Sequence, residues 1–352
     1  MSSLPVEQLE PTLTRQDFLS EIEPRWCAGC GCHAIFKAWT NVLPRLGYPK
    51  EEFVIVSGIG CSSRLPYYAD TYGVHSIHGR APAVALGIKL ANPNLSVWVV
   101  TGDGDALSIG GNHFIHLMRR NPDINVMLFN NQIYGLTKGQ ASPTSPAGTM
   151  TKTSPLGTIE APFHPCSMAI ASGATFVARV TDRDVKMMEE VMYAAAKHDG
   201  VSFIEILENC MIFNDGVYAP LTDKKTRDDT TLILEHGKPL IFGKNRDKGI
   251  LLHGADMRIV KIGESGFTEH DLLVHDVYNP SSTLAYLLSQ FQYPEAPVPL
   301  GIFRSVDAPT YEIEVRAQEK RAEEQLGAPD LKKLLFSGDM WIVDEDGRSH
   351  SV

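Results

Sequence analysis

The chain has 352 residues, of which 43% are hydrophobic and 21% charged, and its formal net charge is −10 at pH 7. Such an acidic chain lacks the basic surface that phosphate contacts require, which argues against nucleic-acid binding. Six cysteines are too few to staple a fold of this length, and the sequence shows neither a signal-like apolar stretch at its start nor ~18 uninterrupted apolar residues. We therefore expect a cytoplasmic protein in which closely spaced cysteines are metal ligands or catalytic groups.

The apolar runs of the sequence point to a parallel sheet. After an N-terminal arm at residues 1–25, runs of strand length occur at residues 53–60, 96–104, 125–131 and 201–208, with segments of helical period between them. Runs rich in Val, Ile and Phe without polar alternation are typical of strands buried on both faces, and their alternation with helices implies right-handed crossovers. The sequence therefore predicts an α/β fold built on a doubly wound, mainly parallel sheet.

One helix is marked by its own sequence, with a cap at Thr181 or Asp182 and an end at Gly200. Its apolar stripe consists of Val185, Met188, Val191, Met192 and Ala195. Further along, prolines, charges and short strand-like runs replace the regular alternation. We therefore divide the chain into an α/β domain at residues 26–215 and a C-terminal extension at residues 216–352, which packs on the core or on a partner subunit.

Polar residues follow two of the predicted strands, at the place where open α/β sheets bind ligands. One apolar run ends in Gly102, Asp103 and Gly104, and the next ends in Asn130 and Asn131. The glycines let the backbone approach a ligand closely, and the following helix can receive a phosphate at its N-terminus. The side-chain oxygens suit Mg²⁺, which takes its other ligands from phosphates and water. Two polar turns in an ordinary α/β protein are the alternative interpretation.

Four of the six cysteines are candidate ligands. Cys27 and Cys30 form a C-x-x-C pair, Cys61 follows the first predicted strand, and Cys210 follows the strand in FIEILENC. Four thiolates suit a tetrahedral site of soft ligands. Zinc fits this count as well as an iron–sulfur cluster does, and a redox-active C-x-x-C pair would need only two of the thiols. The residues alone leave these alternatives open.

Several motifs together resemble a known family. A GDG triplet, a spacer of 25 residues and an NN pair are similar to the thiamine-diphosphate-binding motif of enzymes that convert 2-oxo acids. The segments CAGCGCH, GIGCSSR, HGR, GDGDALSIGGNH and NNQIYGLTKGQ stand in the order seen in β subunits of 2-oxo acid:ferredoxin oxidoreductases, and closely resemble those of the 2-oxoglutarate enzymes. The resemblance is dense over residues 20–215 and loose over the remainder.

The resemblance implies a sheet of the thiamine-diphosphate-binding type and assigns the residues of its site. Mg²⁺ would be held by the side chains of Asp103 and Asn131 and by the carbonyl group of Ile133. A [4Fe-4S] cluster would be held by Cys27, Cys30, Cys61 and Cys210. The residues implied for thiamine diphosphate are Ile59, Gly60, Cys61, Ser62, His78, Gly104, Asp105, Gly135 and Leu136.

The activity implied by the resemblance is the coenzyme A-dependent oxidative decarboxylation of 2-oxoglutarate to succinyl-CoA and CO2, with single electrons passed through the cluster to ferredoxin. No motif in the chain supplies the glutamate that activates the aminopyrimidine of thiamine diphosphate, so we expect an α subunit that carries it, in an αβ or (αβ)2 assembly. The alternatives are an enzyme for pyruvate or another 2-oxo acid, a thiamine-dependent decarboxylase or synthase with a structural metal, and a zinc-stabilised, non-catalytic nucleotide-binding subunit.

A 2-oxoglutarate enzyme must neutralise a second carboxylate, because an unpaired buried carboxylate is costly. Lys138 and, second, Arg64 lie near the predicted crevice by motif position and are the candidates for this role. We interpret Cys32 and Cys166 as structural. The histidines outside the HGR motif that we interpret as packing or surface residues are His33, His75, His113 and His116.

Overall fold

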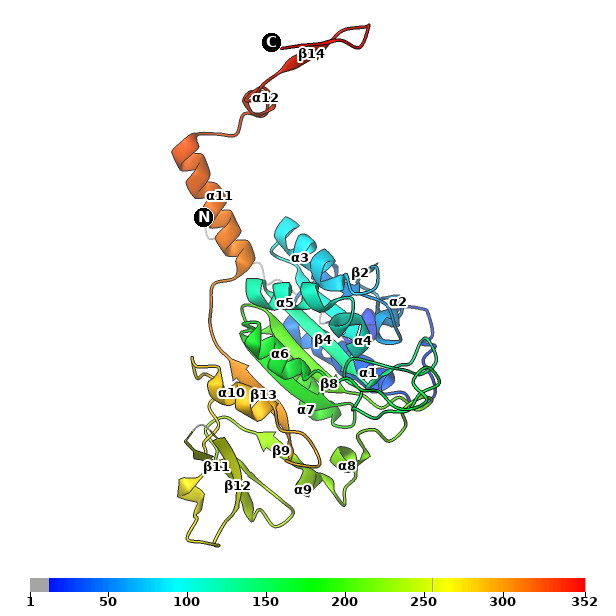
Figure 1. Cartoon of the computed structure of the whole chain (residues 1–352), viewed down its shortest axis with the longest axis vertical. Coiled ribbons are helices and arrows are strands. Elements are labelled where there is room, and N and C mark those ends of the chain that lie inside the picture. The colour runs from blue at the N-terminus through cyan, green and yellow to red at the C-terminus, as the bar shows by residue number, and fades with distance from the viewer. Residues whose placement is uncertain (1–12, 255, 352) are drawn as a thin grey trace, which may run out of the picture. The chain divides into compact units, whose positions relative to one another are not determined.

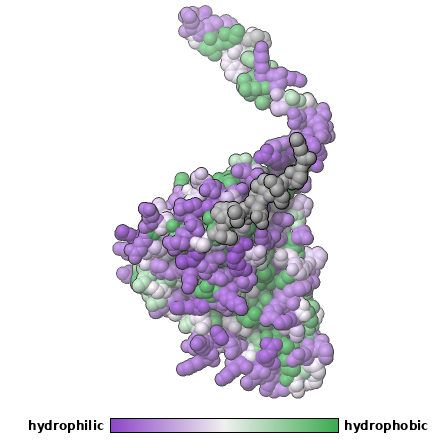
Figure 2. Space-filling model, turned by 180° about the vertical axis from the view of Figure 1, so that it is seen from behind, coloured by the Kyte–Doolittle hydropathy of each residue, from purple (hydrophilic) through white to green (hydrophobic). Residues whose placement is uncertain are grey.

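The computed structural model describes residues 13–254 and 256–351, and the chain divides into two compact units, Met1–Tyr311 and Glu312–Val352. Within these described ranges, no helix is both long and apolar enough to cross a membrane. Polar side chains dominate the face of the molecule drawn in Figure 2, with apolar residues in smaller patches.

An eight-stranded sheet organises the described part of the first unit (Figure 1). In spatial order its strands are β2 (Tyr72–His75), β1 (Phe53–Ser57), β3 (Ser96–Gly102), β4 (Ile124–Asn130), β8 (Ser202–Leu207), β7 (Phe176–Thr181), β13 (Val298–Ser305) and β9 (Thr231–Leu234). Neighbouring strands pair in parallel throughout, except that β13 runs antiparallel to β7. The predicted mainly parallel sheet is confirmed.

Helices cover both faces of this sheet (Figure 1). Side chains of β1 alternate between two cores: Phe53 and Ile55 pack with α1 (Cys32–Leu46) and α7 (Val185–Ala196) on one face. Val54 and Val56 point to the other face, where the covering helices are α3 (Ala81–Ala91), α5 (Gly111–Arg120), α6 (Pro165–Ala171) and α10 (Thr283–Ser289). The sheet is therefore doubly wound, as predicted.

Shorter elements complete the described chain. The helices are η1 (Arg15–Phe18), η2 (Lys50–Glu52), η3 (Ser62–Arg64), α2 (Leu65–Tyr68), α4 (Asp103–Leu107), α8 (Ala219–Thr222), α9 (Arg227–Thr230) and η4 (Glu269–Asp271). A hairpin joins β5 (Ile133–Tyr134) to β6 (Gln140–Ala141), and a small sheet contains β10 (Ile241–Phe242), β11 (Lys248–His253) and β12 (Asp256–Lys261). The second unit contains most of α11 (Tyr311–Leu326), then α12 (Leu331–Leu335) and the hairpin of β14 (Trp341–Val343) and β15 (Ser349–Ser351).

Two strands of the main sheet, β9 and β13, come from beyond residue 215. The segment after the expected domain boundary thus extends the sheet that carries the motifs, and β13 packs directly beside β7. The division of the chain into two parts at residue 215 stays a prediction.

The cap expected at Thr181 or Asp182 was placed too early. Thr181 is the last residue of β7 and pairs with Leu207, and the Asp182 amide still donates to the Leu207 carbonyl group at 3.0 Å. Pairing to the sheet therefore delays the start of α7, and the side chain of Asp184 caps it by accepting from the Met187 amide at 3.0 Å.

Candidate functional site

A pocket of about 130 Å³ opens at the carboxyl ends of the parallel strands. Its lining includes every residue predicted to contact thiamine diphosphate and the three predicted magnesium ligands: Ile59, Gly60, Cys61, Ser62, His78, Asp103, Gly104, Asp105, Asn131, Ile133, Gly135 and Leu136. Residues that come from four separate stretches of sequence therefore meet in one place, because parallel strands end at the same edge.

Asp103 begins α4 directly after β3 and is 2% exposed. Its Oδ2 atom accepts hydrogen bonds from Ser142 Oγ at 2.5 Å and Thr144 Oγ1 at 2.7 Å. Burial raises the pKa of this carboxyl group to about 6, although these two hydroxyl groups and the Gly104 amide partly offset the effect. A buried carboxylate that lacks full compensation attracts a cation, so the donor set fits Mg²⁺.

The two consecutive asparagines after β4 have separate partners. Asn130 donates from Nδ2 to Glu205 Oε1 at 2.8 Å, and its Oδ1 atom lies 2.9 Å from Thr144 Oγ1. Asn131 lines the pocket, donates from Nδ2 to Glu208 Oε2 at 3.0 Å, and accepts at Oδ1 from the Ile133 amide at 3.3 Å. Of these two asparagines only the second lines the pocket, and its role as a magnesium ligand stays a prediction.

At Gly104 the ring of Tyr134 lies so close to the backbone that only glycine fits. A Cβ atom at this position would lie 2.2 Å from Cε1 of Tyr134, whose hydroxyl group donates to the Gly104 carbonyl oxygen at 3.0 Å. Any larger residue at position 104 would displace the Tyr134 ring from the wall of the pocket.

Asp105 ties the loops around the pocket together. Its Oδ1 atom accepts from the amides of Ile59 at 3.0 Å and Gly79 at 2.7 Å, and its Oδ2 atom accepts from Thr101 Oγ1 at 2.6 Å. His78 Nδ1 donates to the same Oδ1 atom at 2.6 Å. Asp105 therefore positions His78 and the Ile59 backbone, which both line the pocket.

The four cysteines predicted as ligands come together beside this pocket. The Cys30 amide donates to the Cys27 carbonyl group at 3.1 Å in a turn, and the Gly31 amide donates at 3.3 Å to the carbonyl group of Asn209, the neighbour of Cys210. The Sγ atoms of Cys61 and Cys210 each lie 3.7 Å from the point that a Cβ atom of residue 135 would occupy.

The pKa of Cys61 also indicates that the four cysteines are close to one another. The pKa of the Cys61 thiol is raised to about 12, first by burial and then by the negative charges of Glu208 and of the other three cysteines of the set. A cluster that spans the four sulfurs would offset this penalty by neutralising the thiolates, so the donor set fits a thiolate-bound centre.

Glu208, which the sequence motifs did not single out, contacts one of these cysteines, Cys30. Its Oε1 atom is 3.5 Å from Cys30 Sγ, and one oxygen of Glu208 and the sulfurs of Cys30 and Cys32 lie within 4.8 Å of one another. Burial holds the pKa of Glu208 well above its usual range. The signal available in the sequence was a carboxyl group directly after a buried strand, two residues before Cys210.

The remaining cysteines are fully buried. Cys32 begins α1 next to Cys30, and its hydrogen bond is the main reason that the pKa of Cys30 falls to about 7. Cys166 begins α6, packs in the hydrophobic core, and lies 3.1 Å from Glu205 Oε2.

The two cations predicted for the substrate carboxylate do not appear among the described residues that line the pocket. Lys138 is exposed in the β5–β6 turn and has a φ of 76°, a left-handed conformation that is uncommon outside glycine. Arg64 is half-buried at the end of η3. Both roles stay predictions.

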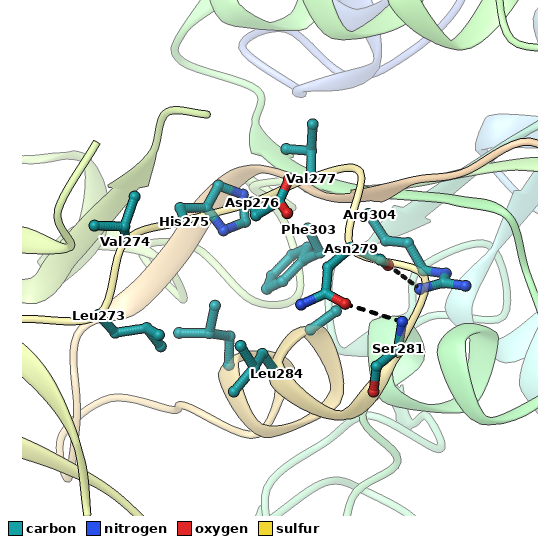
Figure 3. Close-up of a pocket in the computed structure, with 12 residues that line it drawn as sticks. Leu273, Val274, His275, Asp276, Val277, Asn279, Ser281, Leu284, Phe303 and Arg304 are labelled. Atoms are coloured by element: carbon teal, nitrogen blue, oxygen red, sulfur yellow. Dashed lines mark hydrogen bonds between the residues drawn. The ribbon is translucent and has the colours of Figure 1, made fainter. Parts of the chain in front are cut away.

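A second hollow, between β13 and α10, has about 10 Å³ of space (Figure 3). Arg304 fills its polar side by donating to the carbonyl groups of Asn279 at 2.8 Å and Pro280 at 3.0 Å. This space is that of one water molecule, so the hollow is too small for a substrate.

Known proteins resemble this chain in sequence and in fold. Residues 58–206 match the family model described as the C-terminal, thiamine-pyrophosphate-binding domain of thiamine pyrophosphate enzymes. The 2-oxoglutarate oxidoreductase subunit KorB of Mycobacterium tuberculosis is 46% identical over 94% of this chain and 88% of its own length. The 2-oxoglutarate synthase subunit KorB of Archaeoglobus fulgidus is 48% identical over 53% of this chain and 69% of its own length.

Among solved structures, the 2-oxoglutarate:ferredoxin oxidoreductase from Magnetococcus marinus, with 2-oxoglutarate, coenzyme A and succinyl-CoA bound, superposes with a TM-score of 0.72 at 31% identity. The match covers 94% of this chain and 97% of that one. Sequence, fold and the convergence of the motifs at one edge of the sheet agree, and the chain belongs to the β subunits of the 2-oxo acid:ferredoxin oxidoreductases, a family of thiamine-diphosphate-dependent enzymes.

Proposed function

We propose that this chain, together with an α subunit, catalyses the coenzyme A-dependent oxidative decarboxylation of 2-oxoglutarate and passes the electrons singly to ferredoxin. The observation that supports this proposal is that the cofactor site and the cysteine site share a wall. Cys61 lines the same pocket as Asp103 and Asn131, and its sulfur lies beside Gly135, as does the sulfur of Cys210. A redox centre this close to the reacting cofactor has a use that a structural zinc ion lacks.

The first site would hold Mg²⁺ and thiamine diphosphate. The Asp103 carboxylate, the Asn131 amide oxygen and the Ile133 carbonyl oxygen supply hard ligands, and the diphosphate would complete the coordination. When bound, thiamine diphosphate would supply a carbanion for addition to the 2-oxo carbon and an electron sink for the loss of CO2. The protein would hold the diphosphate, and Asp105 orients His78 at the pocket.

The second site would hold a [4Fe-4S] cluster on Cys27, Cys30, Cys61 and Cys210. Thiolate ligands suit this cluster, and its position beside the pocket allows electrons to leave one at a time. Anaerobic purification of the αβ complex tests the assignment: we expect a brown protein with iron and acid-labile sulfide. A colourless protein that contains zinc would refute it.

The partner would cover the mouth of the pocket. Ile59 and Leu136 line the pocket and are 37% and 51% exposed, and Leu156 and Ile159, in the loop between β6 and α6, are 99% and 95% exposed. Apolar side chains this exposed are typical of a protein interface. The α subunit would bring the pyrimidine-binding domain and the activating glutamate, so this chain alone should not turn over a 2-oxo acid.

The preference for 2-oxoglutarate rests on the named activities of the relatives and on the predicted cations Lys138 and Arg64. Initial rates with 2-oxoglutarate, pyruvate and 2-oxobutyrate, measured on the αβ complex with an artificial electron acceptor, test it. A higher kcat/KM for pyruvate would make the chain a subunit of a pyruvate enzyme instead.

A further inference from the structure

Glu208 is a buried carboxyl group that contacts both proposed sites. It follows β8, lines the cofactor pocket and is 1% exposed. One of its oxygens accepts from Asn131 Nδ2 at 3.0 Å, and the other lies 3.5 Å from Cys30 Sγ. One side chain therefore joins a proposed magnesium ligand to a proposed cluster ligand.

The contact with Asn131 settles which end of that amide faces the pocket. The two ends of an amide have nearly the same shape, but only the oxygen can bind Mg²⁺. Asn131 Nδ2 donates to Glu208 Oε2, which leaves Oδ1 on the opposite side of the amide. There Oδ1 accepts from the Ile133 amide at 3.3 Å and retains a second lone pair for the metal.

The backbone and its neighbours keep Glu208 in this position. Its amide donates to the Asn130 carbonyl group at 2.9 Å. The loop of Cys30 packs directly on the side chain, since a Cβ atom on Gly31 would lie 2.6 Å from Glu208 Cγ and 2.2 Å from Asp182 Oδ2. The side chain cannot swing away without moving the loop that carries Cys30.

We propose that Glu208 is a positioning residue that fixes the Asn131 amide with its oxygen toward Mg²⁺ and holds the Cys30 loop in register with it. The inference rests on the proposed function, because it needs both sites. It goes further because it gives one side chain, which belongs to neither ligand set, the role of connecting the magnesium site to the cluster site.

The test compares two substitutions in the αβ complex. Glu208→Gln keeps the length of the side chain and an acceptor oxygen for Asn131, whereas Glu208→Asp keeps the charge but is one methylene group too short to reach. Mn²⁺ replaces Mg²⁺, and its affinity in the presence of thiamine diphosphate is read from the electron paramagnetic resonance signal of the free ion. We expect the Gln variant to bind Mn²⁺ within about twofold of the parent and the Asp variant about tenfold more weakly, the effect of one lost hydrogen bond.

Asp182→Asn is the matched control, because Asp182 is also buried beneath the Cys30 loop but bonds to the Asn209 amide. Its Mn²⁺ affinity should equal that of the parent. Parent-like affinity in Glu208→Asp, or equal losses in the Gln and Asp variants, would overturn the positioning role. A parent complex without iron would instead refute the proposed function, so the two failures are distinguishable.

Discussion

Replacing Asp103 with asparagine should stabilise the metal-free protein and abolish its metal-dependent cofactor binding. The side chain is 2% exposed, and burial raises its pKa from 3.8 to about 6. A raised carboxyl pKa means that the folded state binds the proton more tightly than the unfolded state does, so stability is lost as the pH rises from about 4 to about 6. At about 1.4 kcal/mol per pKa unit, the ionised carboxylate costs about 3 kcal/mol at pH 7, a cost that asparagine avoids.

Urea unfolding of the metal-free parent and of Asp103→Asn, at pH 7 and pH 5, measures this difference. We expect the variant to be more stable by about 3 kcal/mol at pH 7 and by about half as much at pH 5, where the folded parent keeps its proton. Titration with Mn²⁺ and thiamine diphosphate should show binding to the parent but not to Asp103→Asn. Equal stability of the two proteins at pH 7 would refute the reasoning, because Asp103 would then be as well solvated in the fold as outside it.

Three further outcomes follow from the site and the core. Cys210→Ala should lose iron but keep Mg²⁺-dependent cofactor binding, apart from damage through Cys61; iron retained at the parent level would contradict the ligand assignment. Lys138→Ala should raise the KM for 2-oxoglutarate on the order of tenfold to a hundredfold more than the KM for 2-oxobutyrate, and equal losses would give Lys138 another role. Arg179→Leu should lower the free energy of unfolding by about 3–5 kcal/mol, because it strands the buried Glu205 carboxylate 2.8 Å away; a loss below about 1 kcal/mol in urea unfolding would show that Glu205 is otherwise compensated.

The position of the site could be read from the sequence because it depends on a general property of parallel sheets. Asp103 and Asn131 each follow a buried strand. The carboxyl ends of parallel strands lie at one edge of the sheet, and this does not depend on the conformation of the loops. The register of β3 and β4, in which Gly102 pairs with Phe129, then places both residues in the pocket.

Roles that depend on distant contacts could not be read in the same way. Glu208 lies 77 positions from Asn131 in the chain, and its hydrogen bond to that residue exists only in the folded sheet. Asp105 lines the pocket, and its expected contact with the cofactor stays a prediction; the sequence did not show that its carboxylate also accepts from four protein donors, among them His78 and the Ile59 amide. The antiparallel strand β13 lies in the part of the chain without regular alternation, so nothing in its spacing predicted that it would join the sheet.

Cys27 is exposed, whereas Cys30, Cys61 and Cys210 are half-buried. Under the proposed assignment one corner of the cluster reaches the surface of this chain, so the metal centre can be assembled after the polypeptide has folded. Dioxygen would use the same opening, and oxidation would begin at the Cys27 corner. A partner surface that covered Cys27 would therefore be expected to slow this oxidation.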